Sequence, residues 1–186
     1  MYEMKNLFLR YIVDLYQDVP ASVYEGLASI FCIIAVFVIS IKGLKKGFPV
    51  VFLALTIEYI ILILSATVFF RIYNESSGHD FTPFWSYGQI LNGRDDLLAE
   101  SIMNVVVFVP VGLFFGCVSR SVKLWMVLLV GLGLSGAIEV LQFFLKRGFS
   151  EVDDVFHNTL GCMIGYGLYS TGRYLYESFI RRSVAI

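Results

Sequence analysis

Long apolar stretches separated by short charged segments constrain this chain more than any other feature of its sequence. The 186 residues are 58% hydrophobic and only 16% charged, whereas an average soluble domain carries about 25% charged residues. A chain with so few charges lacks the polar side chains needed to cover a water-exposed surface. The net charge of -1 also gives no electrostatic basis for binding nucleic acid. We therefore expect an integral membrane protein.

The gaps between charged residues define five predicted transmembrane helices, because about 20 apolar residues cross a bilayer. The predicted spans are about 21–41, 47–70, 101–119, 124–145 and 155–172. Their apolar character runs around the whole helix, whereas the strands of a membrane β-barrel would alternate. The expected fold class is all-α: a polytopic membrane helix bundle that forms a single membrane domain over 1–186.

Two further segments are expected at the membrane surface. In residues 1–20, apolar residues recur at helical spacing opposite Arg10 and Asp14, which predicts an amphipathic interfacial helix; a frayed N-terminal segment is the alternative. The loop over 80–95 is rich in aromatic residues, which gather at the headgroup level. We expect this loop to lie on the membrane and to form a short helix after Pro83.

Basic residues in the short loops predict the orientation of the chain. The loops after the first, third and fifth predicted spans share one side of the membrane and carry Lys42, Lys45, Lys46, Arg120, Lys123, Arg173, Arg181 and Arg182. Fewer basic residues lie on the other side. The positive-inside rule places the richer side in the cytoplasm. The N-terminus is then expected outside and the C-terminus in the cytoplasm.

Polar residues enter the membrane at one predicted level, at the outer ends of the last three spans. Span three enters the membrane there, span four returns there and span five leaves from there. Glu139 is expected about 9 Å inside, and acids at such a depth usually face a bundle interior or a water-filled cavity. The predicted binding pocket consists of Asn104, Glu139, Gln142, Arg147, Asp153, Asp154 and Asn158, with Arg94 at its rim.

The same residues also have purely structural interpretations, which the sequence leaves open. Glu139 can pair with Arg147 or Arg94, and each of these pairings would neutralise a buried charge. Asp153 and Asp154 can favour the start of a helix through the helix dipole. The two asparagines can form hydrogen bonds between helices.

Glycine pairs in the third and in the fifth predicted span indicate helices that can pack closely against a neighbour. Gly112 and Gly116 are four residues apart, as are Gly161 and Gly165, and such spacing lets two membrane helices approach closely. Pro110 removes a backbone donor and is expected to kink its helix. The three cysteines are dispersed among different spans, so no metal site is predicted.

One ordered set of these residues resembles the VanZ-like family of teicoplanin resistance proteins. The set is Asn104-x3-Phe108-x-Pro110-x-Gly112, then Glu139-x2-Gln142, Arg147, Asp153-Asp154, Asn158, Gly161 and Gly165. The resemblance covers about 81–169. It implies a plasma-membrane protein of bacteria, mostly Gram-positive ones, that is associated with resistance to teicoplanin, a glycopeptide antibiotic with a lipid tail. The resemblance does not supply a molecular mechanism.

Two hypotheses about function follow, and the sequence leaves open whether the chain is an enzyme. In the first, the polar pocket faces the outer leaflet, binds a lipoglycopeptide or a lipid-linked cell-wall precursor among the membrane lipids, and needs no cofactor. In the second, the chain is a membrane enzyme acting on a polyprenyl- or lipid-linked phosphate of the cell envelope. Glu139 and Asp154 are then the catalytic candidates, and Mg²⁺ is expected only in this case.

Overall fold

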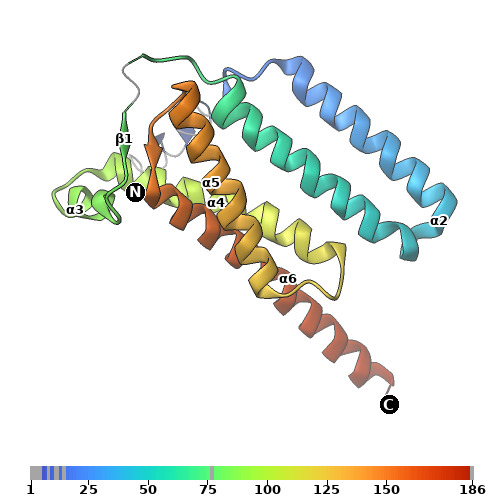
Figure 1. Ribbon diagram of the computed structural model, residues 1–186. Coiled ribbons are helices and arrows are strands. Elements are labelled where there is room, and N and C mark those ends of the chain that lie inside the picture. Colours follow the sequence, from blue (N-terminus) through green and yellow to red (C-terminus); the bar gives the residue numbers. More distant parts are fainter. Residues whose placement is uncertain (1–5, 8, 11–12, 14–15, 76–77, 185–186) are drawn as a thin grey trace.

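The computed structural model describes residues 6–7, 9–10, 13, 16–75 and 78–184 and consists almost entirely of helices (Figure 1). In chain order the elements are helix α2 (Ala21–Leu64), a π-helical turn η1 (Ser65–Phe69), strand β1 (His79–Asp80), helices α3 (Trp85–Leu91), α4 (Asp95–Val118) and α5 (Leu124–Leu145), strand β2 (Ser150–Glu151) and helix α6 (Val152–Val184).

Helix α2 folds back on itself and forms two antiparallel arms (Figure 1). A Cβ atom placed on Gly47 would lie 3.3 Å from Cγ1 of Val38, whereas nine residues of straight helix would separate them by about 13 Å. Pro49 lies inside the helix just after this bend, where it removes a backbone donor and disfavours straight continuation. The two arms are therefore separate helical segments, and each is long and apolar enough to cross a membrane.

Four helical segments of the described chain are long and apolar enough to cross a membrane, and they fit a multi-pass membrane protein. They are Ala21–Ile39, Gly47–Phe69, Asp95–Val118 and Leu124–Leu145, close to the first four predicted spans. Helix α6 covers the fifth predicted span but is less apolar, because polar residues such as His157 and Asn158 lie in it. The fifth crossing therefore stays a prediction.

The bundle is centred on α4 and α6, which pack against each other through glycines. A Cβ atom at Gly112 would overlap the carbonyl oxygen of Cys162, and one at Gly165 would overlap the carbonyl oxygen of Val109. Backbones this close leave no room for larger residues. Helix α4 continues through Pro110 without interruption. Around this contact lies a buried apolar core formed by Ile63, Val68, Phe108, Val111, Val127, Ile138 and Cys162.

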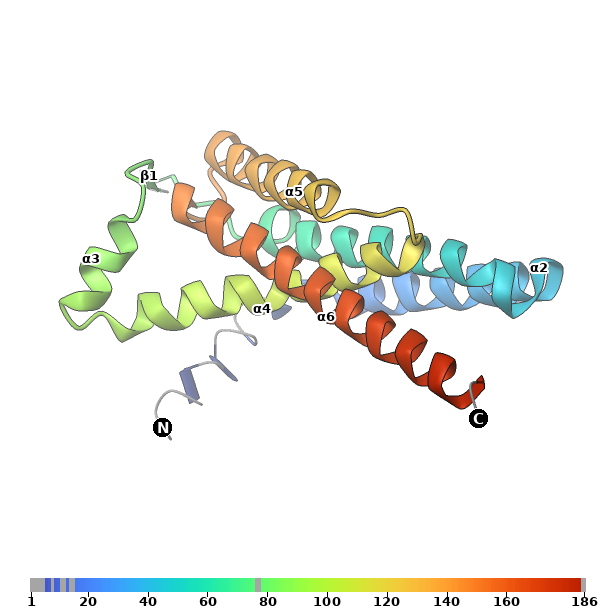
Figure 2. The ribbon, with the colours of Figure 1, turned by 90° about the horizontal axis from the view of Figure 1, so that it is seen from below.

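Two short elements cover one end of the bundle. Strands β1 and β2 pair in parallel, with His79 opposite Ser150 and Asp80 opposite Glu151. Figure 2 shows α3 at this end, while the C-terminal part of α6 projects away from the other helices at the opposite end. The predicted helix after Pro83 thus exists as α3, although its place at a membrane surface stays a prediction. The predicted helix over 1–20 falls largely outside the described residues.

Candidate functional site

Helices α4 and α6 begin, and α5 ends, beside β1 and β2 (Figure 1). Polar side chains gather in this region. We call this region the polar end and define it by Asn104, Ser135, Glu139, Ser150, Glu151, Asp153, Asp154 and Asn158. Most of these side chains are buried. Burial of so many polar groups is costly unless they are hydrogen-bonded, so their partners decide what the region can do.

A direct link between α4 and α6 is made by Asn104 and Asp154. The Asn104 Nδ2 atom donates a hydrogen bond of 2.7 Å to Oδ1 of Asp154. The two residues lie 50 positions apart in the chain, so the contact depends on the close helix packing at the glycines. The bond to a carboxylate is charge-assisted when Asp154 is ionised.

A second link joins α5 to α6 through Ser135 and Asn158. The Asn158 Nδ2 atom donates to Oγ of Ser135 over 2.8 Å, and the Ser135 hydroxyl lies 3.5 Å from the Asp154 carbonyl oxygen. Asn158 is only 5% exposed, yet its Oδ1 atom has no hydrogen-bond partner among the described residues. A buried acceptor of this kind is expected to find a polar partner such as water or a ligand group.

Glu139 holds the β2 segment against α5. Its Oε2 atom accepts a hydrogen bond of 2.8 Å from the backbone N–H of Glu151, and the Ser150 hydroxyl donates to the Glu139 carbonyl oxygen over 3.1 Å. Glu139 is 7% exposed. The carboxylate therefore lies inside the protein and orients the strand that carries a second acid.

Glu151 is a buried acid in an environment of other acids. Burial raises its pKa to about 7, and the charges of Glu100, Asp153 and Asp80 contribute further to this rise, while the Trp85 indole opposes it. Glu151 is therefore protonated over part of the range below neutral pH. Its side chain can act as a hydrogen-bond donor or acceptor depending on pH.

Asp153 connects α6 to the short helix α3. Its Oδ1 atom accepts from the backbone N–H of Phe84 over 2.5 Å, and its Oδ2 atom accepts from the N–H and the hydroxyl of Ser86 over 3.1 and 2.5 Å. Phe84 has a positive φ of 63°, an uncommon conformation for a bulky residue. Both oxygens of Asp153 are thus engaged in fixing the start of α3, which agrees with a structural interpretation for this residue.

Gln142 and Arg147 bind the end of η1. The Gln142 amide donates to the Thr67 carbonyl over 3.1 Å, and the Arg147 guanidinium donates to the carbonyls of Val68 and Phe69. A cation at the C-terminal end of a helix is favoured by the helix dipole. Arg147 therefore stabilises the end of α2 and η1 and is occupied by protein carbonyl groups.

The other arginines are arranged differently from the sequence-based expectation. Arg94 pairs with Asp96 over 2.7 Å, and both side chains are more than half exposed, so Arg94 is engaged at the surface. Arg71 instead interacts electrostatically with Glu100 and Glu139. Its place after η1 gives no local signal of this interaction.

Some residues in or beside the polar end were not singled out as site residues by sequence, and their signals differ. Ser135 precedes Glu139 by four residues, so helical spacing alone would have placed both on one face of α5. His157 and Tyr87 form a hydrogen bond of 3.0 Å between residues 70 positions apart, and no local pattern indicates that pairing.

Among the described residues, no group of three His, Cys, Asp or Glu side chains could hold a metal ion.

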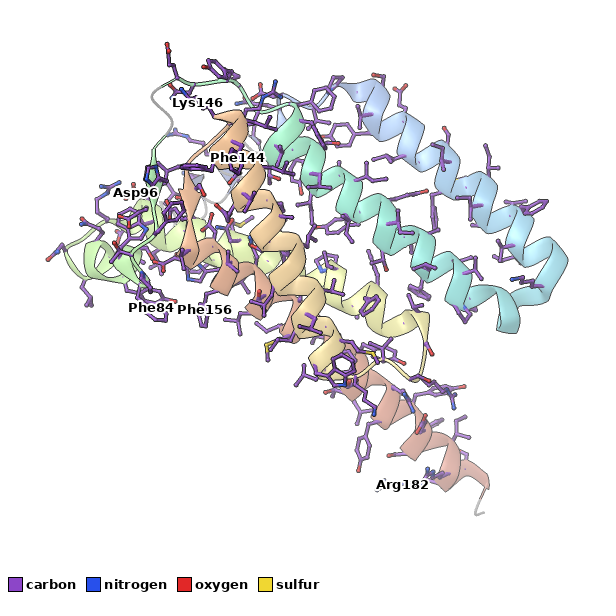
Figure 3. The ribbon with its side chains drawn as sticks, in the orientation of Figure 1. Phe84, Asp96, Phe144, Lys146, Phe156 and Arg182 are labelled. Carbon is purple, nitrogen blue, oxygen red and sulfur yellow. The ribbon has the colours of Figure 1, made fainter. Side chains whose placement is uncertain are left out.

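Exposed aromatic rings surround the polar end. The Phe84 and Phe156 rings pack edge to face with centroids 5.9 Å apart, and Phe144 is 76% exposed at the end of α5 beside Lys146 (Figure 3). Rings with polar neighbours suit the headgroup level of a bilayer. These rings fit a polar end that lies at a membrane surface.

Comparison with known proteins identifies the family. The family model described as VanZ/LLP1 matches residues 49–175. Protein VanZ of Enterococcus faecium is 26% identical over 128 residues, which is 69% of this chain and 74% of the relative. No solved structure matches the chain. Because the family model covers more than half of the sequence, the chain belongs to the VanZ/LLP1 family.

Proposed function

We propose that this chain is a multi-pass protein of a bacterial plasma membrane that lowers susceptibility to lipid-tailed glycopeptides of the teicoplanin type. In this proposal the polar end faces the outer leaflet, with the N-terminus outside and the C-terminus in the cytoplasm. The polar end binds the antibiotic or a lipid-linked cell-wall precursor and so reduces access of the antibiotic to its target. No cofactor is required for such binding.

The observation that carries the proposal is the convergence of buried polar groups from three helices on one end of the bundle. Asp154, Glu139 and Asn158 come from different turns of α5 and α6, yet hydrogen bonds connect each of them to a neighbouring element. The Oδ1 atom of Asn158 accepts no hydrogen bond from the described part of the chain. The family match includes all of these residues, and the name of the relative, Protein VanZ, supports the resistance role.

The alternative of a membrane enzyme acting on a lipid-linked phosphate receives less support from the geometry. In that hypothesis, Arg147 and Arg94 would hold the diphosphate of a lipid-linked substrate. In the structure, however, Arg147 binds backbone carbonyls and Arg94 pairs with Asp96. Each of these guanidinium groups is thus already directed at a partner within the protein. Recognition by the polar end is therefore the proposal that we favour.

The test is to express the chain in a susceptible Gram-positive host and to compare inhibition by teicoplanin and by vancomycin, which lacks the lipid tail. The wild type is expected to protect against teicoplanin and little against vancomycin. Glu139→Gln and Asp154→Asn are expected to lose protection, because each replaces a carboxyl oxygen of the polar end with an amide nitrogen.

Exposed acids provide matched controls for these two substitutions. Glu75 and Asp95 are exposed, so Glu75→Gln and Asp95→Asn make the same chemical changes outside the polar end and should keep protection. Membrane levels of every variant are measured by immunoblot. Wild-type cells as sensitive as empty-vector cells would refute the resistance role, and full protection by both polar-end variants would refute the polar end as its site.

A further inference from the structure

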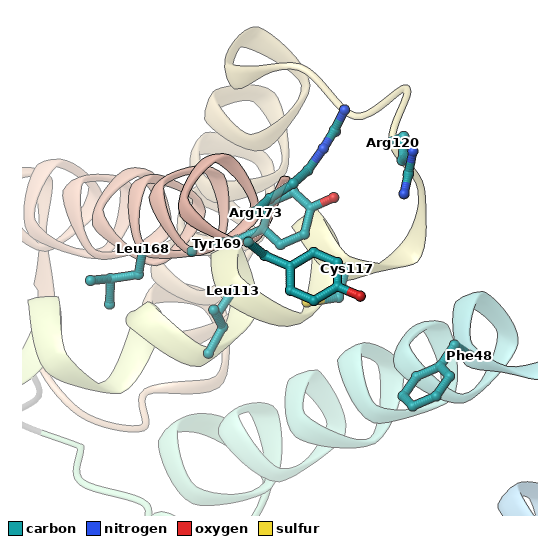
Figure 4. Close-up of a pocket in the computed structure, with 9 residues that line it drawn as sticks. Phe48, Leu113, Cys117, Arg120, Leu168, Tyr169 and Arg173 are labelled. Atoms are coloured by element: carbon teal, nitrogen blue, oxygen red, sulfur yellow. The ribbon is translucent and has the colours of Figure 1, made fainter. Parts of the chain in front are cut away.

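A groove lies at the opposite end of the bundle from the polar end, between α4, α6 and the start of the second arm of α2. Its volume is about 680 Å³. Phe48, Leu113 and Leu168 contribute apolar walls, and Arg120 and Arg173 stand at its edge (Figure 4). The groove thus combines an apolar wall with guanidinium groups at one side. This combination suits an amphipathic ligand, which has an apolar part and an anionic part.

Arg173 lies about one bilayer thickness away from the polar end along helix α6. Arg173 follows Asp153 by 20 residues on α6, which corresponds to about 30 Å of helix. This length equals the typical thickness of a bilayer's hydrocarbon core. If Asp153 lies at one membrane surface, Arg173 reaches the headgroup level of the other leaflet.

The charges at this end are unbalanced. Arg173 donates to Glu177 over 3.0 Å, and Arg120 lies 3.9 Å from the same carboxylate. Glu177 is the only acid in residues 113–124 and 166–184, whereas these segments also carry Lys123, Arg181 and Arg182. One carboxylate shared between two guanidinium groups leaves positive charge and free N–H donors for an anion.

We propose that this groove binds an anionic phospholipid from the adjacent leaflet. An acyl chain would lie along Leu113 and Leu168, and the phosphate would accept hydrogen bonds from Arg120 and Arg173. Guanidinium groups suit phosphate oxygens because their planar donors can bind two oxygens at once. Basic pockets between membrane helices on the cytoplasmic side are known to take anionic headgroups. This site lies apart from the polar end and does not depend on the function proposed for it.

Native mass spectrometry of the full chain in detergent tests the proposal with phosphatidylglycerol and phosphatidylcholine of identical acyl chains. The wild type is expected to retain phosphatidylglycerol in preference to phosphatidylcholine. Arg120→Gln and Arg173→Gln should each weaken phosphatidylglycerol binding about fivefold, and the double variant about 30-fold. Arg181→Gln with Arg182→Gln is the control, because it removes the same charge from exposed positions outside the groove.

A second pair of variants fills the groove without changing charge. Cβ atoms at Gly172 and Gly167 would meet no atom within 4 Å, but only Gly172 lines the groove. Gly172→Leu is therefore expected to reduce phosphatidylglycerol binding, and Gly167→Leu to leave it unchanged.

Three results would each overturn the proposal. The first is equal retention of the two lipids by the wild type. The second is a loss of binding in the Arg181→Gln and Arg182→Gln control as large as that in the groove variants, which would indicate attraction by net charge alone. The third is displacement of phosphatidylglycerol by inorganic phosphate at equal concentration, which would indicate an anion site without a lipid component.

Discussion

The amide of Asn104 on α4 donates a hydrogen bond of 2.7 Å to the carboxylate of Asp154 on α6. This contact joins the two most closely packed helices of the bundle at the polar end. It links the stability of the fold to the geometry of the proposed site.

The Asn104–Asp154 bond is expected to contribute about 1 kcal/mol to the free energy of unfolding, the usual range for hydrogen bonds between membrane helices. A double-mutant cycle with Asn104→Ala and Asp154→Ala, followed by unfolding in mixed detergent micelles, measures this coupling. The same cycle with Asp95→Ala in place of Asp154→Ala is the control and should give additive effects. Additive effects in both cycles would mean that the bond contributes nothing.

Gly161→Ala is expected to destabilise the bundle by about 1–3 kcal/mol, the usual cost of overpacking. A Cβ atom there would overlap the carbonyl oxygen of Val105 on α4, so the two helices must move apart. Gly167→Ala on the same helix meets no atom within 4 Å and should keep or raise stability, because alanine favours helix. Thermal unfolding in detergent distinguishes the two, and equal melting temperatures would contradict the packing seen here.

Asp153→Asn is expected to release the start of α3. The amide side chain has one carbonyl oxygen in place of two carboxylate oxygens, so the N–H of Phe84 or that of Ser86 loses its acceptor. Loss of an acceptor costs about 1–3 kcal/mol, and hydrogen exchange of the amides at 84–86 should accelerate about tenfold or more. Asp95→Asn serves as the control. Unchanged exchange in Asp153→Asn would show that other contacts hold α3.

Glu151 should make the stability of the protein depend on pH. Its pKa is raised from 4.5 to about 7 by burial, so between these values the folded state holds a proton that the unfolded state has lost. Stability is therefore expected to fall as pH rises through this range and to level off above pH 7. Melting temperatures at several pH values should show a shallower decline in Glu151→Gln, while the exposed-site control Glu75→Gln keeps the wild-type decline. An unchanged decline in Glu151→Gln would refute this role.

The long helices of this protein could be predicted from the sequence, because an uninterrupted run of about 20 apolar residues indicates a helix long enough to cross a membrane. Four of the predicted spans correspond to apolar helical segments in the structure. The basic segment that separates the first two predicted spans coincides with the bend of α2 between Val38 and Gly47. Helix α6 covers the fifth predicted span, but it is less apolar than the other four segments. Its composition therefore does not establish that it crosses the membrane.

The partners of the polar residues could be predicted only in part. Helical spacing and chain direction brought Asn104, Glu139, Asp154 and Asn158 to one end, and the structure places them together there. The partner of Arg147 could not be found in this way. Its guanidinium binds carbonyls 78 and 79 residues earlier in the chain, a contact that depends on how α5 ends beside η1.

The sequence by itself determined the helical class, the four apolar segments that are long enough to cross a membrane, and the end of the bundle at which the polar groups gather. These properties depend on hydropathy and helical period, which act over neighbouring residues. Tertiary structure decided that Asp153 fixes α3, that Glu151 is buried and that Arg71 interacts electrostatically with Glu139. The physical reason is that a hydrogen bond or charge interaction requires atoms within a few ångströms, and packing between distant segments alone sets those distances.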